Sequence, residues 1–277
     1  MTNKTLRQEL FALQRHLQAH FDDPAFEARR LLQDSLDLDN NQFLNRLDDI
    51  LNVCEAAKIE SVLARRQKGE PLSKILGWRE FYGRRFLVNH ETLDPRPDSE
   101  LLIDIALKHL GKGANVLDLG CGTGCLGLTL AAERPDLSLT LSDICPGALD
   151  VAQENALRLG VDANFILSDW FAHIKGPFQM ILSNPPYIPL AECAYLKSAV
   201  RDYDPVLALN GGIDGLKAYR VLAQQAGACL TQKGQLLIEH GQEQQSVLNT
   251  LFTQKKWQKI EGFKDLGQKE RALLLTQ

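Results

Sequence analysis

The sequence predicts an α/β protein in which a small amino-terminal helical bundle precedes a doubly wound, parallel sheet. From about residue 5 to residue 69 apolar residues recur at helical spacing, and from residue 114 onward short apolar runs alternate with helical stretches. Between these regions the segment WREFYGRRFLVN alternates large apolar and polar residues around Gly83, as a β-hairpin does. We therefore expect a helical domain at 1–73, a hairpin linker at 74–95 and an α/β domain at 96–277.

The composition is that of a folded globular protein. The chain has 277 residues, of which 44% are hydrophobic and 24% charged, so it is long enough for two domains with a sizeable core. Its net charge of −4 excludes a global positive field that would draw it onto nucleic acid, but it does not exclude a local basic patch. No apolar run has the length of a signal peptide or a membrane span, and we expect a cytoplasmic protein without a membrane partner.

The amino-terminal helices are predicted in three stretches, LRQELFALQRHLQ, FEARRLLQDSL and LNVCEAAKIESVLARRQKG. Pro24 and the polar run from Asp37 to Gln42 separate these stretches. Charges of both signs are interleaved along them, which is typical of a solvated face and also of a module that docks a partner.

The α/β domain begins after Pro95 and Arg96. Pro97 suits the first turn of a helix and Asp98 or Ser99 its cap, so the segment ELLIDIALKHL is predicted to be helical. Further helices are predicted at GCLGLTLAAERP, PGALDVAQENALRLG, YRVLAQQAGACL and QSVLNTLFTQ. Strands are predicted at ANVLDLG, LSLTLSD, ANFILSD, FQMILSN, GQLLIEHG and RALLLTQ.

The cysteines and histidines form no recognisable catalytic or metal-binding pattern. The six cysteines lack paired CxxC spacing, and they are expected to be reduced, small apolar residues: Cys54, Cys121, Cys125, Cys145, Cys193 and Cys229. The six histidines lie apart, without a GxSxG or HExxH frame. We expect no metal site.

A glycine-rich loop follows the first strand of the α/β domain, in the run Asp118-Leu119-Gly120-Cys121-Gly122-Thr123-Gly124. Glycines at a strand-to-helix junction let the backbone approach a ligand closely. The spacing Gly122-x-Gly124-x-x-Gly127 also satisfies the dinucleotide fingerprint. The loop alone therefore does not distinguish a nicotinamide dinucleotide from S-adenosylmethionine (SAM).

Acidic residues mark three successive strand ends. Asp118 precedes the loop, Asp143 ends the next strand where an acid suits ribose hydroxyls, and Asp169-Trp170 ends the third. The Asp169 carboxylate can accept from an adenine amino group, and the Trp170 ring can cover its face. Taken singly, the two later acids are also ordinary helix caps and the tryptophan an ordinary core residue. Their coincidence favours a nucleotide-like ligand.

The most specific pattern is Asn184-Pro185-Pro186-Tyr187, directly after the strand FQMILS. Two successive prolines remove two backbone donors and leave carbonyl oxygens free to accept. The Asn184 side-chain oxygen and the Pro185 carbonyl can then bind one NH₂ group, while Tyr187 stacks on the planar group that bears it. Such bonds can pyramidalise an amide or aryl amine nitrogen and aim its lone pair at a methyl group.

Several segments together resemble the HemK-type (PrmC) protein-glutamine N5-methyltransferases that modify peptide chain release factors. The resemblance runs through most of the chain, on PLSKILGWREFYGRRF, LDPRPDSE, VLDLGCGTGCLGL, the DIC acid with Asn155 downstream, SDWF, SNPPYIP, ALNGGIDGLKAYR and KDLGQKERALL. It implies a Rossmann-like SAM-dependent methyltransferase sheet, mostly parallel with an antiparallel C-terminal strand. It also implies an amino-terminal domain that recognises the release factor, whose Gly-Gly-Gln loop presents the glutamine.

Site residues follow from this resemblance together with the patterns above. We expect SAM as cofactor, bound by Asp118, Gly120, Cys121, Gly122, Thr123, Gly124, Asp143, Asp169, Trp170 and Asn184. We expect catalysis by Asn184, Pro185 and Tyr187, and substrate binding by Asn184, Pro185, Pro186, Tyr187 and Arg96. The sequence departs from the family pattern at Asp94, where an apolar residue is expected in many relatives, and at Asp98-Ser99, where a glutamate-threonine pair is typical. Two roles stay open for Arg96, ordering its loop and reaching the substrate.

Four other functions share part of the pattern. A close relative of the family methylates a glutamine of a ribosomal protein, and an adenine-N6 nucleic-acid methyltransferase shares the NPPY tetrapeptide but calls for a basic, aromatic-bearing recognition domain. A nicotinamide oxidoreductase leaves the segment from Asn184 to Tyr187 unexplained. A non-catalytic binding module leaves the whole pocket unexplained.

Overall fold

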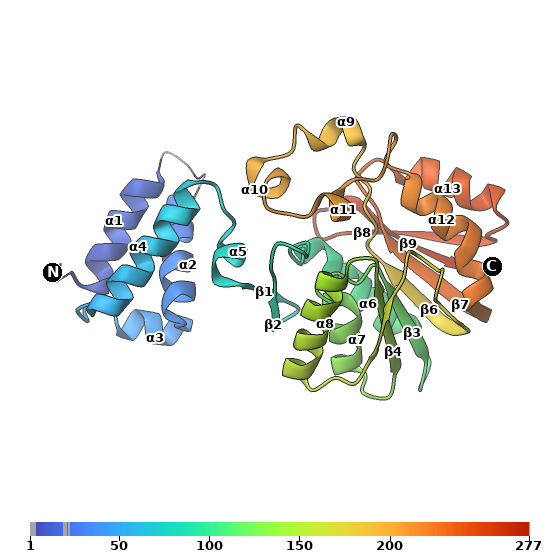
Figure 1. The fold of residues 1–277 in the computed structure, drawn as a ribbon, viewed down its shortest axis with the longest axis horizontal. Coiled ribbons are helices and arrows are strands. Elements are labelled where there is room, and N and C mark those ends of the chain that lie inside the picture. The colour runs from blue at the N-terminus through green and yellow to red at the C-terminus, as the bar shows by residue number, and fades with distance from the viewer. Residues whose placement is uncertain (1–3, 19–20, 22, 277) are drawn as a thin grey trace. The chain divides into compact units, whose positions relative to one another are not determined.

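The computed structural model describes residues 4–18, 21 and 23–276, and it divides the chain into two compact units (Figure 1). The division falls between Gly77 and Trp78, so the hairpin belongs to the second unit. Within the described residues, no helix combines the length and the apolar character that crossing a membrane requires.

The first unit is a helical bundle, as predicted, with α1 (Leu6–Leu17), α2 (Pro24–Leu36), α3 (Asn40–Asn45), α4 (Val53–Gln67) and α5 (Leu72–Leu76). The short α3 begins inside the polar run that was predicted as a break. Asp39 accepts a hydrogen bond from the Gln42 backbone, and the Gln42 side chain accepts one from the Asp39 backbone. This capping box turns the polar run into a helix start. The bundle closes over buried leucines and Phe43.

The second unit opens with the predicted hairpin, formed by β1 (Trp78–Phe81) and β2 (Arg84–Leu87) in antiparallel pairing. Tyr82 and Gly83 both have positive φ, at 51° and 70°, as a two-residue turn that follows the strand twist requires. The Phe81 and Phe86 rings meet edge to face with centroids 6.1 Å apart. These two buried rings join the hairpin to the core of the unit.

A seven-stranded sheet forms the centre of the second unit, in the order β5-β4-β3-β6-β7-β9-β8. The strands are β3 (Asn115–Leu119), β4 (Ser138–Asp143), β5 (Asn164–Leu167), β6 (Phe178–Ser183), β7 (Leu230–Glu239), β8 (Lys259–Lys264) and β9 (Glu270–Thr276). The first five are parallel, and β9 runs antiparallel to both β7 and β8. The Rossmann-like fold class with its antiparallel C-terminal strand is confirmed, and β8 is an additional strand.

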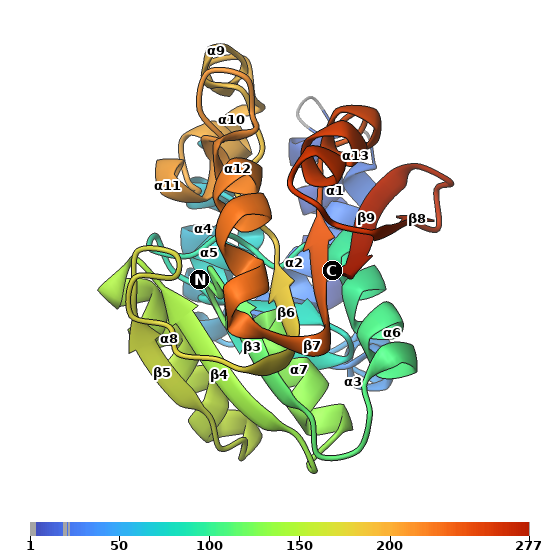
Figure 2. The same cartoon turned by 90° about the vertical axis from the view of Figure 1, so that its right-hand side faces the viewer.

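Helices cover both faces of the sheet (Figure 2). Along β3, Val116 belongs to the core cluster shared with α6 (Glu100–His109), α7 (Cys125–Glu133) and α8 (Pro146–Leu159). Its neighbour Leu117 belongs to the opposite cluster, shared with α12 (Lys217–Gln225) and α13 (Gln245–Gln254). This alternation is the period of a strand buried on both faces. Short helices complete the unit: η1 (Pro97–Ser99), α9 (Leu190–Cys193), α10 (Ser198–Arg201), α11 (Val206–Leu209) and η2 (Ala226–Cys229).

The strand order reverses between β3 and β6, which are neighbours in the sheet although β4 and β5 lie between them in sequence. In open parallel sheets, ligands bind at the carboxyl ends of the strands beside such a switch point. The glycine loop follows β3, and Asn184 follows β6. The fold therefore brings the two most informative sequence patterns to the same crevice.

Candidate active site

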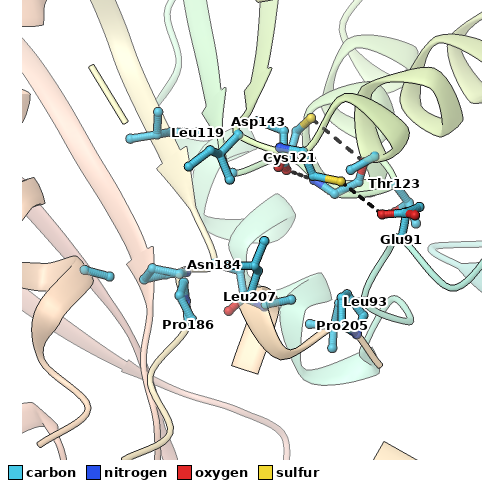
Figure 3. A pocket seen from close by; sticks show the side chains of 18 of the residues that line it. Glu91, Leu93, Leu119, Cys121, Thr123, Asp143, Asn184, Pro186, Pro205 and Leu207 are labelled. Atoms are coloured by element: carbon cyan, nitrogen blue, oxygen red, sulfur yellow. Dashed lines mark hydrogen bonds between the residues drawn. The ribbon is translucent and has the colours of Figure 1, made fainter. Parts of the chain in front are cut away.

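A cavity of about 420 Å³ lies at the carboxyl ends of β3, β4 and β6, a size typical of small-molecule sites. It collects most of the predicted site residues, namely Arg96, Gly120, Cys121, Gly122, Thr123, Asp143, Asp169, Trp170, Asn184, Pro185 and Pro186. Figure 3 shows Asp143, Cys121 and Thr123 grouped on one side of this cavity, and Asn184 with Pro186 on another. Asp118, Gly124 and Tyr187 do not line it.

The glycine loop faces the cavity with its backbone. Gly120, Gly122 and Gly124 all have positive φ, at 73°, 53° and 76°. A Cβ added to Gly120 or Gly122 would meet no protein atom within 4 Å, whereas one on Gly124 would come within 2.8 Å of the Leu128 side chain. The first two glycines thus keep space open for a ligand, and the third lets α7 pack closely.

Asp118 supports the loop from beneath. Its carboxyl is 1% exposed, and Oδ2 accepts the Gly127 N–H at 2.8 Å at the start of α7. Oδ1 has no hydrogen-bond partner among the described residues. Burial raises the pKa of this carboxyl to about 7. The structure therefore places Asp118 behind the loop, where it positions the backbone.

Asp143 ties the loop to the next strand. One carboxylate oxygen accepts the Gly122 N–H and the other the Cys145 N–H, each at 2.9 Å. The pKa of Asp143 is raised overall, because the effect of burial outweighs the opposite effect of these backbone donors. A carboxylate has about four acceptor positions, so Asp143 keeps acceptor capacity beyond these two bonds.

The third strand end contributes Asp169 and Trp170, and both line the cavity. Trp170 has a positive φ of 50°, and the Ser168 hydroxyl fixes this turn by donating to the Trp170 carbonyl and accepting from His173 N–H. The half-buried Trp170 ring packs against the core on the α12 face, while Asp169 is exposed. An aromatic surface and an acid therefore adjoin at this wall.

Asn155 belongs to the sequence pattern without a role predicted for it, and the structure shows which groups its side chain binds. Its side-chain oxygen accepts the Leu87 N–H at 2.7 Å, and its NH₂ group donates to the Leu87 and Thr123 carbonyls at 3.1 and 3.0 Å. This buried residue joins the hairpin to the glycine loop. The sequence offers one indication of this role, because Asn155 is a single polar residue on the otherwise apolar face of α8.

A second cavity, of about 320 Å³, adjoins the first. Asn184 and Arg96 line both cavities, and Tyr187 lines the second. Burial raises the pKa of Tyr187, so its phenol stays neutral near pH 7. Asn184 therefore lies at the junction of the two cavities.

Arg96 is held at this junction by a residue that the sequence patterns did not single out. Its Nη2 donates to Asp204 at 2.6 Å, and Asp204 also accepts the Asp94 N–H at 3.4 Å. The Asp204 side chain is 2% exposed and directly precedes the segment from Pro205 to Ala208, which lines the first cavity. Arg96 therefore lines the cavity and is hydrogen-bonded to the residue that precedes this part of its wall.

A hydrogen-bonded chain reaches Asn184 from two further residues. Asn184 Nδ2 donates to Ser99 Oγ at 3.2 Å, and Ser99 Oγ donates to a Glu239 carboxylate oxygen at 2.5 Å. Ser183 pairs with Ile238 in the sheet, so Asn184 and Glu239 follow neighbouring parallel strands. Glu239 was not predicted as a site residue, although an acid at the end of the apolar strand GQLLIEHG is a signal for it.

Comparison with known proteins agrees with this geometry. Residues 11–77 match the PrmC N-terminal domain, and residues 89–199 match the methyltransferase small domain. The release factor glutamine methyltransferase of Agrobacterium fabrum is 39% identical over 97% of this chain and 96% of its own length. That of Cereibacter sphaeroides is 43% identical over 95% and 94%.

Solved structures show the same fold. A methyltransferase from Pyrococcus furiosus superposes with a TM-score of 0.55 at 17% sequence identity, covering 78% of this chain and 98% of that one. This likeness concerns the fold, whereas the sequence relatives span nearly the whole chain at about 40% identity. The chain belongs to the family of release factor glutamine methyltransferases.

Proposed function

We propose that this protein transfers the methyl group of SAM to the side-chain amide nitrogen, N5, of the glutamine in the Gly-Gly-Gln motif of peptide chain release factors. The observation that carries the proposal is the position of Asn184, which lines both a cavity of small-molecule size and a second cavity beside Tyr187. Family membership over nearly the full chain supports the same reaction.

The first cavity fits SAM. Gly120 and Gly122 leave space that any side chain would occupy, and Asp143 keeps acceptor positions for ribose hydroxyls. Trp170 offers an aromatic surface, and Asp169 an acceptor for an adenine amino group. When bound, SAM supplies an electrophilic methyl group on a sulfonium.

The segment from Asn184 to Tyr187 acts on the acceptor amide. We propose that Asn184 Oδ1 and the Pro185 carbonyl accept the two N–H bonds of the glutamine amide, while the Tyr187 ring packs on its plane. Such bonding withdraws the nitrogen lone pair from conjugation with the glutamine carbonyl and directs it at the methyl carbon. As the nitrogen gains the methyl group, the S–CH₃ bond of the sulfonium breaks to leave a neutral thioether, and the nitrogen gives up one proton to solvent. The transfer is direct, so no covalent enzyme intermediate is needed.

Two buried thiols in the wall of the first cavity are poor nucleophiles at neutral pH. Burial raises the pKa of the Cys121 thiol well above its ordinary value and that of Cys125 to about 12. Both line the first cavity as neutral thiols, and the thiolate is the reactive form. Neither thiol therefore competes with the bound amide for the methyl group.

We assign the first unit, residues 1–77, to recognition of the release factor, because its match is to the amino-terminal domain of this family. We further propose that the protein acts in the cytoplasm, on a protein substrate and without membrane or nucleic-acid partners. The net charge of −4 supports the absence of a nucleic-acid partner.

The test is methylation of purified, unmodified release factor with SAM, followed by tandem mass spectrometry. We expect one added methyl on the glutamine of the Gly-Gly-Gln motif, and none when that glutamine is replaced by alanine. Transfer only to ribosomal protein or to DNA adenine would overturn the substrate while keeping the acceptor chemistry. No transfer to any of the three would overturn the proposed function.

A further inference from the structure

The Ser99 side chain does not cap the helix that it precedes. It precedes α6 at the helix cap, a position where serine side chains ordinarily accept a backbone N–H of the first turn. Its side chain makes no such capping bond. The hydroxyl, in a residue that is 2% exposed, instead joins Asn184 to Glu239, across 85 and 140 residues of sequence.

The charge state of Glu239 sets the direction of both hydrogen bonds that run from Asn184 through Ser99 to Glu239. Burial raises the pKa of Glu239 to about 7, so above that pH its ionised carboxylate only accepts, and the Ser99 hydroxyl donates its one proton to it. The lone pairs of Ser99 Oγ then face Asn184, which turns its NH₂ group toward them. The Asn184 carbonyl oxygen is thereby left for a ligand of the cavities that Asn184 lines.

We propose that Ser99 and Glu239 are positioning residues that fix the rotation of the Asn184 side-chain amide, so that its oxygen faces the NH₂ group of the acceptor glutamine. This inference rests on the proposed function. With the Asn184 amide rotated by half a turn, two NH₂ groups would meet and neither could accept. Nothing in the chemistry of an asparagine alone prevents that rotation, because its two ends have nearly the same shape.

The presence of a carboxylate at position 239 supports this assignment. Glu239 is 1% exposed, and burying a carboxylate costs stability unless it is hydrogen-bonded and compensated by charge. Arg271 supplies part of that compensation, although it also pairs with Asp98 at 3.0 Å and Asp265 at 3.4 Å. A glutamine at position 239 would avoid the cost of a buried carboxylate. Its NH₂ group could, however, donate to Ser99 Oγ, and the directions of both hydrogen bonds would then reverse.

The experiment compares four variants of the full chain: Ser99→Ala, Ser99→Thr, Glu239→Gln and, as a control, Thr129→Val. Thr129 is a buried hydroxyl of the same unit outside both cavities. We expect Ser99→Ala and Glu239→Gln to lower kcat roughly ten- to hundredfold, because misplaced catalytic groups cost on that order. The Kd for SAM, from calorimetry, is expected to stay within about threefold. Ser99→Thr, which restores the hydroxyl, is expected to recover most of the kcat lost in Ser99→Ala.

A kcat within about twofold of the wild type in both Ser99→Ala and Glu239→Gln would overturn the inference. An equal loss in Thr129→Val would overturn it as well, since the effect would then be general destabilisation.

A second measurement does not depend on the substrate. The Asn184 side-chain NH₂ group, followed by nuclear magnetic resonance in ¹⁵N-labelled protein, is expected to be protected from hydrogen exchange in the wild type and in Ser99→Thr. Protection is expected to fall in Ser99→Ala, where Glu239 is the acceptor that remains for this NH₂ group. Exchange in the wild type as fast as that of the exposed Asn164 would overturn the inference. If protection is found but no release factor is methylated, the proposed function fails and the hydrogen-bonded chain stands.

Discussion

The two sides of the active site are built in different ways. On the cofactor side, at the ends of β3 and β4, carboxylates hold a backbone loop through N–H donors 9 and 21 residues away, in the pairs Asp118 with Gly127 and Asp143 with Gly122. On the acceptor side, at the ends of β6 and β7, side chains hold other side chains across 85 to 140 residues. Backbone geometry dominates the first side, and a tertiary network the second.

Because of this difference, we expect substitutions on one side to change SAM binding and substitutions on the other side to change methyl transfer. Substitutions in the glycine loop and at Asp143 alter the space and the acceptors that SAM needs, so they act on its Kd. Substitutions around Asn184 disturb how the acceptor amide nitrogen is held, so they are expected to lower kcat. Four measurements test whether the two sides act separately, and the expected effects decrease from the first measurement to the last.

Asn184→Ala is expected to lower kcat by about 10³-fold, the order seen when a preorganised hydrogen-bonding group is removed from an active site. The Kd for SAM is expected to stay within about threefold, since the glycine loop and Asp143 are untouched. Single-turnover methylation of release factor measures the first quantity, with the exposed Asn164→Ala as the control. Activity near that of the wild type would remove Asn184 from the mechanism.

Gly122→Val is expected to weaken SAM binding by about a hundredfold or more, because the added side chain occupies the open space over the loop. The matched control is Gly160→Val. Gly160 also has a positive φ, 64°, and open space around a Cβ, but it ends α8 outside the cavity. Calorimetry that finds equal Kd changes in both variants would show that backbone strain, not occupied space, causes the effect.

Asp143→Ala is expected to raise the Kd for SAM roughly ten- to hundredfold, the equivalent of about 1.5–3 kcal/mol for hydrogen bonds to a charged group. At saturating SAM, kcat is expected to fall by no more than about threefold. Asp162→Ala, at an exposed acid outside both cavities, provides the control. An unchanged Kd would remove Asp143 from the cofactor site.

The two buried carboxyls also predict how stability depends on pH. Burial raises the pKa of Asp118 and of Glu239 to about 7, whereas in the unfolded chain both ionise near pH 4. Between about pH 5 and 7 the folded state therefore binds more protons, and the free energy of unfolding falls as the pH rises, by up to about 1.4 kcal/mol per pH unit for each carboxyl.

Denaturant titrations at pH 5, 6 and 7 measure that slope. Asp118→Asn is expected to reduce it, because one of the two groups no longer titrates. Asp214→Asn is the control: the Arg220 hydrogen bond lowers the pKa of this exposed acid to about 2, so it is ionised in both states over this range. A slope that Asp118→Asn leaves unchanged would contradict the burial argument for that carboxyl.

Most of the fold was predictable from the sequence, because long periodic segments carry their own signal. The order of β3 to β7 and the helices between them follow from alternating apolar runs, and Gly83 marked the hairpin. The elements that were missed are short or edge elements, such as α3 and β8. The first depends on one capping box and the second on pairing with β9, and neither leaves a long periodic pattern.

The site was predictable on its cofactor side more than on its acceptor side. Gly120, Gly122 and Asp143 belong to local strand-end patterns, and the structure brings them to one cavity. The partnership of Ser99 with Glu239, and that of Arg96 with Asp204, join residues more than 100 positions apart. Only the register of β6 and β7 and the path of the chain after residue 187 bring such groups together.

The most direct test of this division is a calorimetric titration of SAM into Asn184→Ala beside Asp143→Ala. We expect Asn184→Ala to bind SAM within about threefold of the wild type while transferring almost no methyl, and Asp143→Ala to bind weakly yet turn over at saturating SAM. Loss of SAM binding in Asn184→Ala, or intact binding in Asp143→Ala, would contradict the account of a cofactor side and an acceptor side with separate tasks.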